Sequence, residues 1–141
     1  MANVCYCADD FALNSSISNA IIDLIQKNRL HATSCMTQSP EWPNAAQQLK
    51  PYTFQAEVGL HLNFTHVFDS NTWAFSLPQL MFKAWSRQLS RQKVYESIQA
   101  QWQAFTQALG QTPDFVDGHQ HVHQFPVIRE VLIQFLQEQN F

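Results

Sequence analysis

The fold is decided by a stretch near the C-terminal end of the chain, Phe115-Val116-Asp117-Gly118-His119-Gln120-His121-Val122-His123. Histidines two positions apart cannot share one face of a helix, where neighbours recur every three or four residues. In an extended segment they can, so His119, His121 and His123 are predicted to point the same way. Imidazole is the commonest protein ligand for divalent metals, and carboxylates commonly join it. The alternative is a polar loop whose histidines bond to water and backbone. The clustering beside Asp117, at the end of an apolar run, favours a metal or catalytic site.

Two further apolar runs end in residues of the same kind. Residues 4–11, Val-Cys-Tyr-Cys-Ala-Asp-Asp-Phe, reach the adjacent carboxylates Asp9 and Asp10. Residues 57–63, Glu-Val-Gly-Leu-His-Leu-Asn, carry one histidine and one asparagine near their end. In α/β folds, ligands gather at the carboxyl ends of the strands. Asp9 and Asp10 could instead cap the following helix, but two like charges repel and a cation would relieve that repulsion.

The composition bounds the class of protein. The chain has 141 residues, the size of one ordinary domain, so residues 1–141 are predicted to form a single domain. The net charge of −3 and the absence of a basic run argue against nucleic-acid binding. No secretory signal or membrane-length apolar run is visible, so we expect a cytoplasmic protein without a membrane partner. The three cysteines lie in apolar segments and are predicted to be buried, reduced thiols: Cys5, Cys7 and Cys35.

Strand-like runs alternate with helical periodicity along the chain. The predicted strands are residues 3–8, 30–36, 55–62 and 114–118. The predicted helices, with their capping residues, are 14–29, 40–49, 79–110 with Gly110 as the C-terminal cap, and a last one from Pro126 onward. This alternation predicts an α/β fold with a parallel sheet and right-handed crossovers. Residues 65–78 are aromatic and aperiodic, and they form either the wall of a sugar site or a hydrophobic flap over the core.

Four βα units amount to half of a (β/α) barrel, which needs roughly 200 residues or more. An open four-stranded parallel sheet is possible, but it leaves two edges to cover. We therefore expect the chain to self-associate, at least as a dimer around a two-fold axis, the commonest symmetry.

Four motifs together resemble the YdjC-like carbohydrate deacetylases, a family that includes chitooligosaccharide deacetylase. They are Cys7–Leu13 (CADDFAL), Leu30–Met36 (LHATSCM), Val58–Thr65 (VGLHLNFT) and Asp117–His123 (DGHQHVH). Each motif alone is weak, but they come in the family's order at similar spacing and span essentially the whole chain. The resemblance implies a deviant (β/α) barrel of the carbohydrate deacetylase type, of which this chain is the N-terminal half.

The resemblance also implies a reaction, the metal-dependent removal of N-acetyl groups from an amino sugar or chitooligosaccharide. Asp10, His61 and His119 match the family's metal positions, and Asp9 matches the neighbouring carboxylate, the expected catalytic base. The ion is one divalent metal, zinc or magnesium; imidazole ligands favour zinc, whereas magnesium prefers oxygen.

The same motifs supply groups expected to orient the ligands or contact the substrate, a small carbohydrate: His121, His123, Asn63 and Asp117. The chain departs from the family pattern at Ala12, where glycine is usual, and at Cys7, where asparagine is frequent. It also lacks the family's C-terminal half, which carries a further His-Pro motif. The alternative function is therefore a truncated, catalytically incompetent remnant that binds a metal or a sugar, and a different metal-dependent hydrolase stays open.

Overall fold

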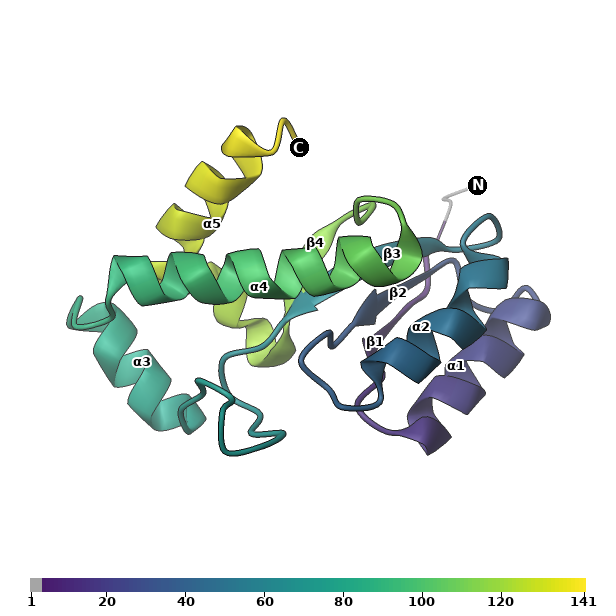
Figure 1. The fold of residues 1–141 in the computed structure, drawn as a ribbon, viewed down its shortest axis with the longest axis horizontal. Coiled ribbons are helices and arrows are strands. Elements are labelled where there is room, and N and C mark those ends of the chain that lie inside the picture. The colour runs from purple at the N-terminus through teal and green to yellow at the C-terminus, as the bar shows by residue number, and fades with distance from the viewer. Residues whose placement is uncertain (1–3) are drawn as a thin grey trace.

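Four parallel strands form one sheet in the computed structural model, which describes residues 4–141 (Figure 1). The strands are β1 (Cys7–Phe11), β2 (Ala32–Cys35), β3 (Glu57–Leu62) and β4 (Val116–Gly118). They neighbour one another in chain order, and each pair is parallel. Parallel neighbours need a crossover connection, which helices supply here. The predicted α/β architecture, a parallel sheet with alternating helices, is confirmed.

Five α-helices and two short 3-10 helices accompany the sheet in the described part of the chain. They are α1 (Ser15–Gln26), α2 (Trp42–Leu49), η1 (Lys50–Tyr52), α3 (Leu77–Trp85), α4 (Arg91–Leu109), η2 (His119–Gln124) and α5 (Ile128–Glu138). The predicted cap of α1 is present, since Asn14 Oδ1 accepts a hydrogen bond from the Ile17 amide at 3.0 Å. Between residues 4 and 141, no helix combines the length and the apolarity needed to cross a membrane.

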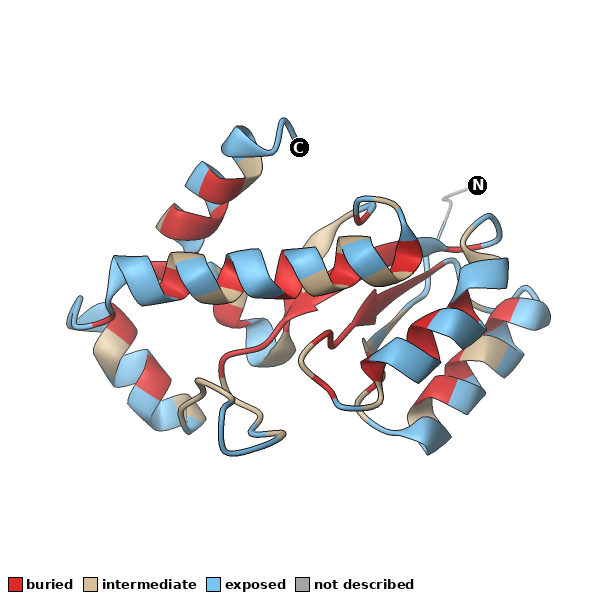
Figure 2. Ribbon diagram, viewed as in Figure 1, coloured by how far each residue is buried: buried red, intermediate tan, exposed pale blue. Residues whose placement is uncertain are grey.

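The core lies between the sheet and the helices α1, α2 and α4, which cover one side of it (Figure 1). Figure 2 shows buried stripes along these helices and a buried β3. Trp42 of α2 stacks on Phe105 of α4, with ring centroids 5.9 Å apart. From β3, Val58, Leu60 and Leu62 are fully buried. Each such side chain stabilises the fold by about 1.5–3 kcal/mol relative to exposure, so β3 is anchored and its carboxyl end is held in place.

The first strand differs from the predicted strand 3–8. It begins at Cys7 and continues through both carboxylates, and Asn3 lies outside the described residues. Among residues 4–141, β1 pairs only with β2, so it is an edge strand, and Cys7 near its start is exposed. The predicted burial is therefore wrong for Cys5 and Cys7, which are exposed, and is confirmed for Cys35 of the interior strand β2.

The predicted helix 79–109 is two helices, α3 and α4. The chain turns at Arg87, which has a left-handed φ of 56°, and α4 then starts afresh. Ser90 caps it, because its Oγ accepts a hydrogen bond from the Lys93 amide at 3.3 Å. Such a cap stabilises a helix start by about 1 kcal/mol. The predicted end is confirmed, since Gly110 adopts a left-handed φ of 75°.

Candidate active site

Three of the predicted ligands meet at the carboxyl ends of β1, β3 and β4. Asp10 Oδ1 lies 2.8 Å from His119 Nδ1 and 3.2 Å from His61 Nε2. One candidate ligand atom from each residue lies within 4.8 Å of the other two. A carboxylate and two imidazoles at this spacing suit one divalent cation, and three protein ligands leave a coordination position open, as catalytic sites do.

Adjacent carboxylates reach the same region because β1 is irregular. In a regular strand, successive side chains point to opposite faces of the sheet. Here the register shifts within the strand, and Asp10 has a left-handed φ of 63°. That conformation costs a non-glycine residue roughly 1–2 kcal/mol, and strain of this kind concentrates at functional sites. As a result Asp9, which is exposed, forms a second group of possible ligands with His61 and Asp117, again within 4.8 Å.

His61 is held from its other side by Asp117 and Ser34. Its Nδ1 lies 2.7 Å from Asp117 Oδ1 and 3.0 Å from Ser34 Oγ, and Ser34 donates to Asp117 Oδ2 at 3.0 Å. A carboxylate on Nδ1 sets the tautomer and orientation of a ligating histidine, which turns Nε2 toward Asp10. Sequence reasoning missed Ser34. The available signal was a pair of hydroxyl residues, Thr33 and Ser34, inside a fully buried strand.

The charges of the site favour positive charge at its centre. Hydrogen bonds from His119 and His61 hold the pKa of Asp10 well below its usual range. Burial opposes a charge on His61, which is only 3% exposed, yet its hydrogen bonds to Asp10 and Asp117 outweigh this and raise its pKa to about 9. The carboxylates therefore hold a proton on His61, and a divalent cation would compete for the same negative charge.

The predicted extended arrangement of the three histidines after β4 is wrong. Residues His119–Gln124 form η2, in which His121 takes a left-handed φ of 58°. The turn places Val122 in the core, where it is fully buried. His119 alone joins the metal-competent cluster, whereas His121 is exposed to solvent.

His123 packs under the backbone of Gly118 instead of facing the cluster. A Cβ added to Gly118 would lie 3.0 Å from His123 Nδ1, so the two residues approach closely. Burial lowers the pKa of His123, and its buried Nδ1 has no hydrogen-bond partner among residues 4–141. Its ring occupies the space that a side chain at residue 118 would need.

Asn63 is fully buried and shapes a turn beyond β3. Its Oδ1 accepts hydrogen bonds from the amides of Thr65 and His66, at 3.1 and 2.8 Å. Its Nδ2 donates to Gln38 Oε1 and to the His66 carbonyl, both at 2.8 Å. The buried Gln101 of α4 clamps the Asn63 backbone on both its amide and its carbonyl. Asn63 therefore positions the loop after β3, and all the polar groups of its side chain are already used within the described residues.

This turn brings a further histidine to the site. The His66 ring lies edge-on to His119, with centroids 6.2 Å apart, and it also packs on Phe68 at 4.4 Å. Sequence reasoning passed over His66 because it lies alone at the start of an aperiodic loop. The signal that could have found it is the side chain of Asn63, which commonly bonds to the backbone two residues on and bends the chain.

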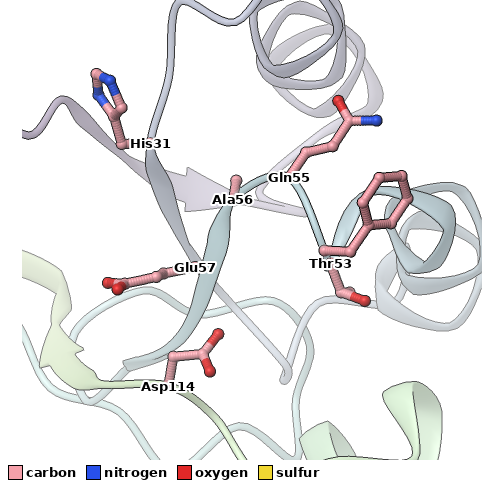
Figure 3. A pocket seen from close by; sticks show the side chains of 7 residues that line it. His31, Thr53, Gln55, Ala56, Glu57 and Asp114 are labelled. Carbon is pink, nitrogen blue, oxygen red and sulfur yellow. The ribbon is translucent and has the colours of Figure 1, made fainter.

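A separate cavity of about 280 Å³ opens at the opposite, amino-terminal end of the sheet. Figure 3 shows the carboxylates of Glu57 and Asp114 beside it, with His31 turned aside. Asp114 already accepts a hydrogen bond from the Val58 amide at 2.7 Å. In α/β folds ligands bind at the carboxyl ends of strands, so this cavity lies at the end of the sheet opposite to the expected ligand position.

Known proteins match almost the whole chain. The family model described as YdjC-like protein matches residues 3–141. The chain is 27% identical to the chitooligosaccharide deacetylase of Serratia marcescens, over 94% of this chain and 55% of that protein. It is 28% identical to the carbohydrate deacetylase of Halalkalibacterium halodurans, over 93% and 58%, and 28% identical to that of Danio rerio, over 92% and 45%. The chain thus spans about half the length of the curated relatives it matches.

The fold is also found in a solved structure. A crystal structure from Enterococcus faecalis V583, of a protein provisionally named for cellobiose-phosphate cleavage, superposes with a TM-score of 0.77. The superposition covers 95% of this chain and 55% of the other, at 20% identity. At this identity the match concerns the fold alone.

Proposed function

Because this chain belongs to the YdjC-like family, we propose that it carries the metal-binding half of a carbohydrate N-deacetylase. The substrate class is an amino sugar or chitooligosaccharide with an N-acetyl group, which hydrolysis converts into a free amine and acetate. The observation that carries the proposal is the convergence of Asp10, His61 and His119 from three different strand ends. Relatives named as chitooligosaccharide and carbohydrate deacetylases support the substrate class.

In this proposal, Asp10, His61 and His119 hold one divalent ion. The donor set supports it, because one carboxylate and two imidazoles suit zinc or another transition ion, while magnesium would prefer more oxygen. A divalent ion bound there would polarise the acetamide carbonyl and lower the pKa of a water molecule.

The remaining residues of the site orient the ligands and move a proton. Asp117 and Ser34 hold Nδ1 of His61, so that Nε2 faces the position of the ion. Asp9 is exposed beside the cluster, and its carboxylate is the group placed to accept the proton of the attacking water. In this proposal Asp9 is the general base and Asp10 is a metal ligand.

Elemental analysis of two purified variants tests the metal assignment. His119→Ala should lose most of the bound metal, because it removes one of three protein ligands. His121→Ala is the matched control, since His121 belongs to the same motif but is exposed and lies outside the cluster. Metal content at the wild-type level in His119→Ala would refute the assignment.

Acetate release from N-acetylated chitooligosaccharides tests the reaction. A chelator should abolish it and added metal should restore it. Metal binding without acetate release would favour the other candidate role, a non-catalytic metal- or sugar-binding protein.

A further inference from the structure

We propose that a cavity between α4 and the loops after β2 and β3 binds a second sugar unit of the substrate. It has a volume of about 370 Å³ and is lined by Gln38, Asn71, Trp73, Lys93, Glu96 and Ser97. The inference rests on the proposed deacetylase function, because it assigns this cavity to the part of the same substrate that is not being deacetylated.

The lining fits a neutral, polyhydroxylated ligand. Trp73 offers an apolar ring, and two amides, a hydroxyl and charges of both signs surround it. Glu96 would repel an anion and Lys93 would repel a cation. Sugar hydroxyls, in contrast, can donate hydrogen bonds to Glu96 and accept them from Lys93. Binding sites for small ligands commonly combine aromatic walls with a few placed polar groups in this way.

Several of these polar groups are available to a ligand. In the described part of the chain, the side chains of Lys93 and Asn71 make no hydrogen bond, and Lys93 forms no ion pair. Gln38 uses its Oε1 to accept from Asn63, which leaves its Nε2 to donate. A hydroxylated ligand would therefore gain hydrogen bonds without breaking those that hold the loop.

Trp73 is fixed before any ligand arrives. Its ring packs edge-on against Phe64 and Phe75, with centroids 6.0 and 5.1 Å away. Phe64 is fully buried, and its carbonyl accepts a hydrogen bond from the Phe75 amide at 2.9 Å. A side chain that is already ordered loses little conformational freedom on binding, so its contact contributes more of its energy to affinity. The aromatic loop thus covers core with one part and lines a ligand cavity with another.

A short chain of contacts connects this cavity to the active site. Gln38 bonds to Asn63 at 2.8 Å, Asn63 bonds to the His66 amide at 2.8 Å, and the His66 ring contacts His119. Both loops that line the cavity follow carboxyl ends of strands, the same end of the sheet as the candidate metal ligands. A sugar chain whose N-acetyl group lies at His119 could therefore extend its next unit past His66 toward Trp73.

Sugar binding without metal or catalysis tests the cavity separately from the reaction. The dissociation constants of N-acetylglucosamine, diacetylchitobiose and triacetylchitotriose would be measured by calorimetry on the purified chain with chelator present. The disaccharide and trisaccharide should bind more tightly than the monosaccharide. Trp73→Ala should weaken trisaccharide binding roughly tenfold, the worth of one good aromatic contact. Trp85→Ala is the matched control, because Trp85 is an exposed tryptophan of α3 outside the cavity.

A second pair of variants guards against a folding effect at Trp73. Ala100 also lines the cavity from the exposed surface of α4, so Ala100→Phe should fill it and weaken the trisaccharide to the level of the monosaccharide. Gln99→Phe places the same ring one residue away, outside the lining, and should leave binding unchanged. Circular dichroism confirms that each variant is folded.

The possible results separate the two proposals. Equal affinity for one, two and three sugar units overturns the cavity assignment. So does unchanged trisaccharide affinity in Trp73→Ala or in Ala100→Phe. An equal loss in Trp85→Ala or Gln99→Phe overturns it as well. Length-dependent binding that both cavity variants remove supports the assignment, even where acetate release fails and the deacetylase proposal falls.

Discussion

Replacing Gly59 with alanine tests how closely β3 and β4 pack beside the candidate active site. A Cβ at this position would lie within 2.7 Å of three ring atoms of Phe115. Carbon atoms in favourable contact are roughly 3.5–4.0 Å apart, so the ring would have to move by about 1 Å. Phe115 immediately precedes β4, and its carbonyl accepts a hydrogen bond from the Leu60 amide at 3.0 Å. The ring can therefore move only by leaving its half-buried position or by displacing β4.

Overpacking of this kind costs about 1–3 kcal/mol. For a domain of this size, that cost lowers Tm by about 3–10 °C. If β4 moves, Asp117 moves away from His61, since the two residues pair directly across the strands. Gly59→Ala should therefore also weaken metal binding, although residue 59 contacts no ion.

Thermal unfolding of four proteins measures the effect: wild type, Gly59→Ala, Phe115→Ala and the double variant. Removing the ring removes the clash, so Gly59→Ala should cost almost nothing in the Phe115→Ala background. The coupling free energy from this cycle should then equal most of the single-variant cost, about 1 kcal/mol or more. A Tm of Gly59→Ala equal to wild type, or additive effects in the double variant, would refute the packing argument.

Four further predictions concern the site and the assembly. Asp117→Asn should weaken metal binding about 10–100-fold, the usual effect of removing a carboxylate behind a ligating histidine; isothermal titration with zinc measures it, and unchanged affinity contradicts the role of Asp117. In an active form, Asp9→Asn should retain its metal and lose turnover by about a hundredfold or more; loss of metal instead would make Asp9 the ligand. The pKa of His61 is raised to about 9 from an unfolded value of 6.5, so in metal-free protein its contribution to the free energy of unfolding is complete below 6.5 and disappears as pH rises through 9. Urea unfolding across this pH range should show a fall in the free energy of unfolding of the wild type and none in His61→Gln. The same pH dependence in both proteins would exclude this contribution of His61. Light scattering should show self-association, because β1 is an open edge and Phe82 and Trp85 of α3 are 66% and 58% exposed; a monomer at high concentration contradicts this.

The order of elements could be predicted because its signals are local. Apolar runs of strand length, a helix cap at Asn14 and a left-handed glycine at residue 110 each act within a few residues of the chain. The start of α4 was not predicted, because the periodicity of the sequence allows Ser90 either inside a helix or at the beginning of one. The Ser90 hydroxyl acts as a helix cap only because the chain turns at Arg87, which leaves the Lys93 amide free to donate to it.

The residues of the candidate site were proposed from the sequence, whereas their arrangement was not. Asp10, His61 and His119 were identified as possible ligands because parallel strands bring their carboxyl ends to one edge, whatever the details of packing. The separate placement of His121 and His123 accompanies the burial of Val122, and burial is a gain that arises only when the core surrounds that side chain.

The sequence by itself thus determined the α/β class, the alternation of elements and the types of candidate ligand at the strand ends, because each follows from periodicity and short-range chemistry. Only the tertiary structure decided that Asp9 and Asp10 both face His61, since this requires a register shift and a strained Asp10 that no local pattern specifies. It also decided that Ser34 and Asp117, 83 residues apart, hold the same imidazole. Contacts between residues so distant in sequence form only when the sheet is assembled, and the energy of burial then stabilises conformations that local preference alone would disfavour.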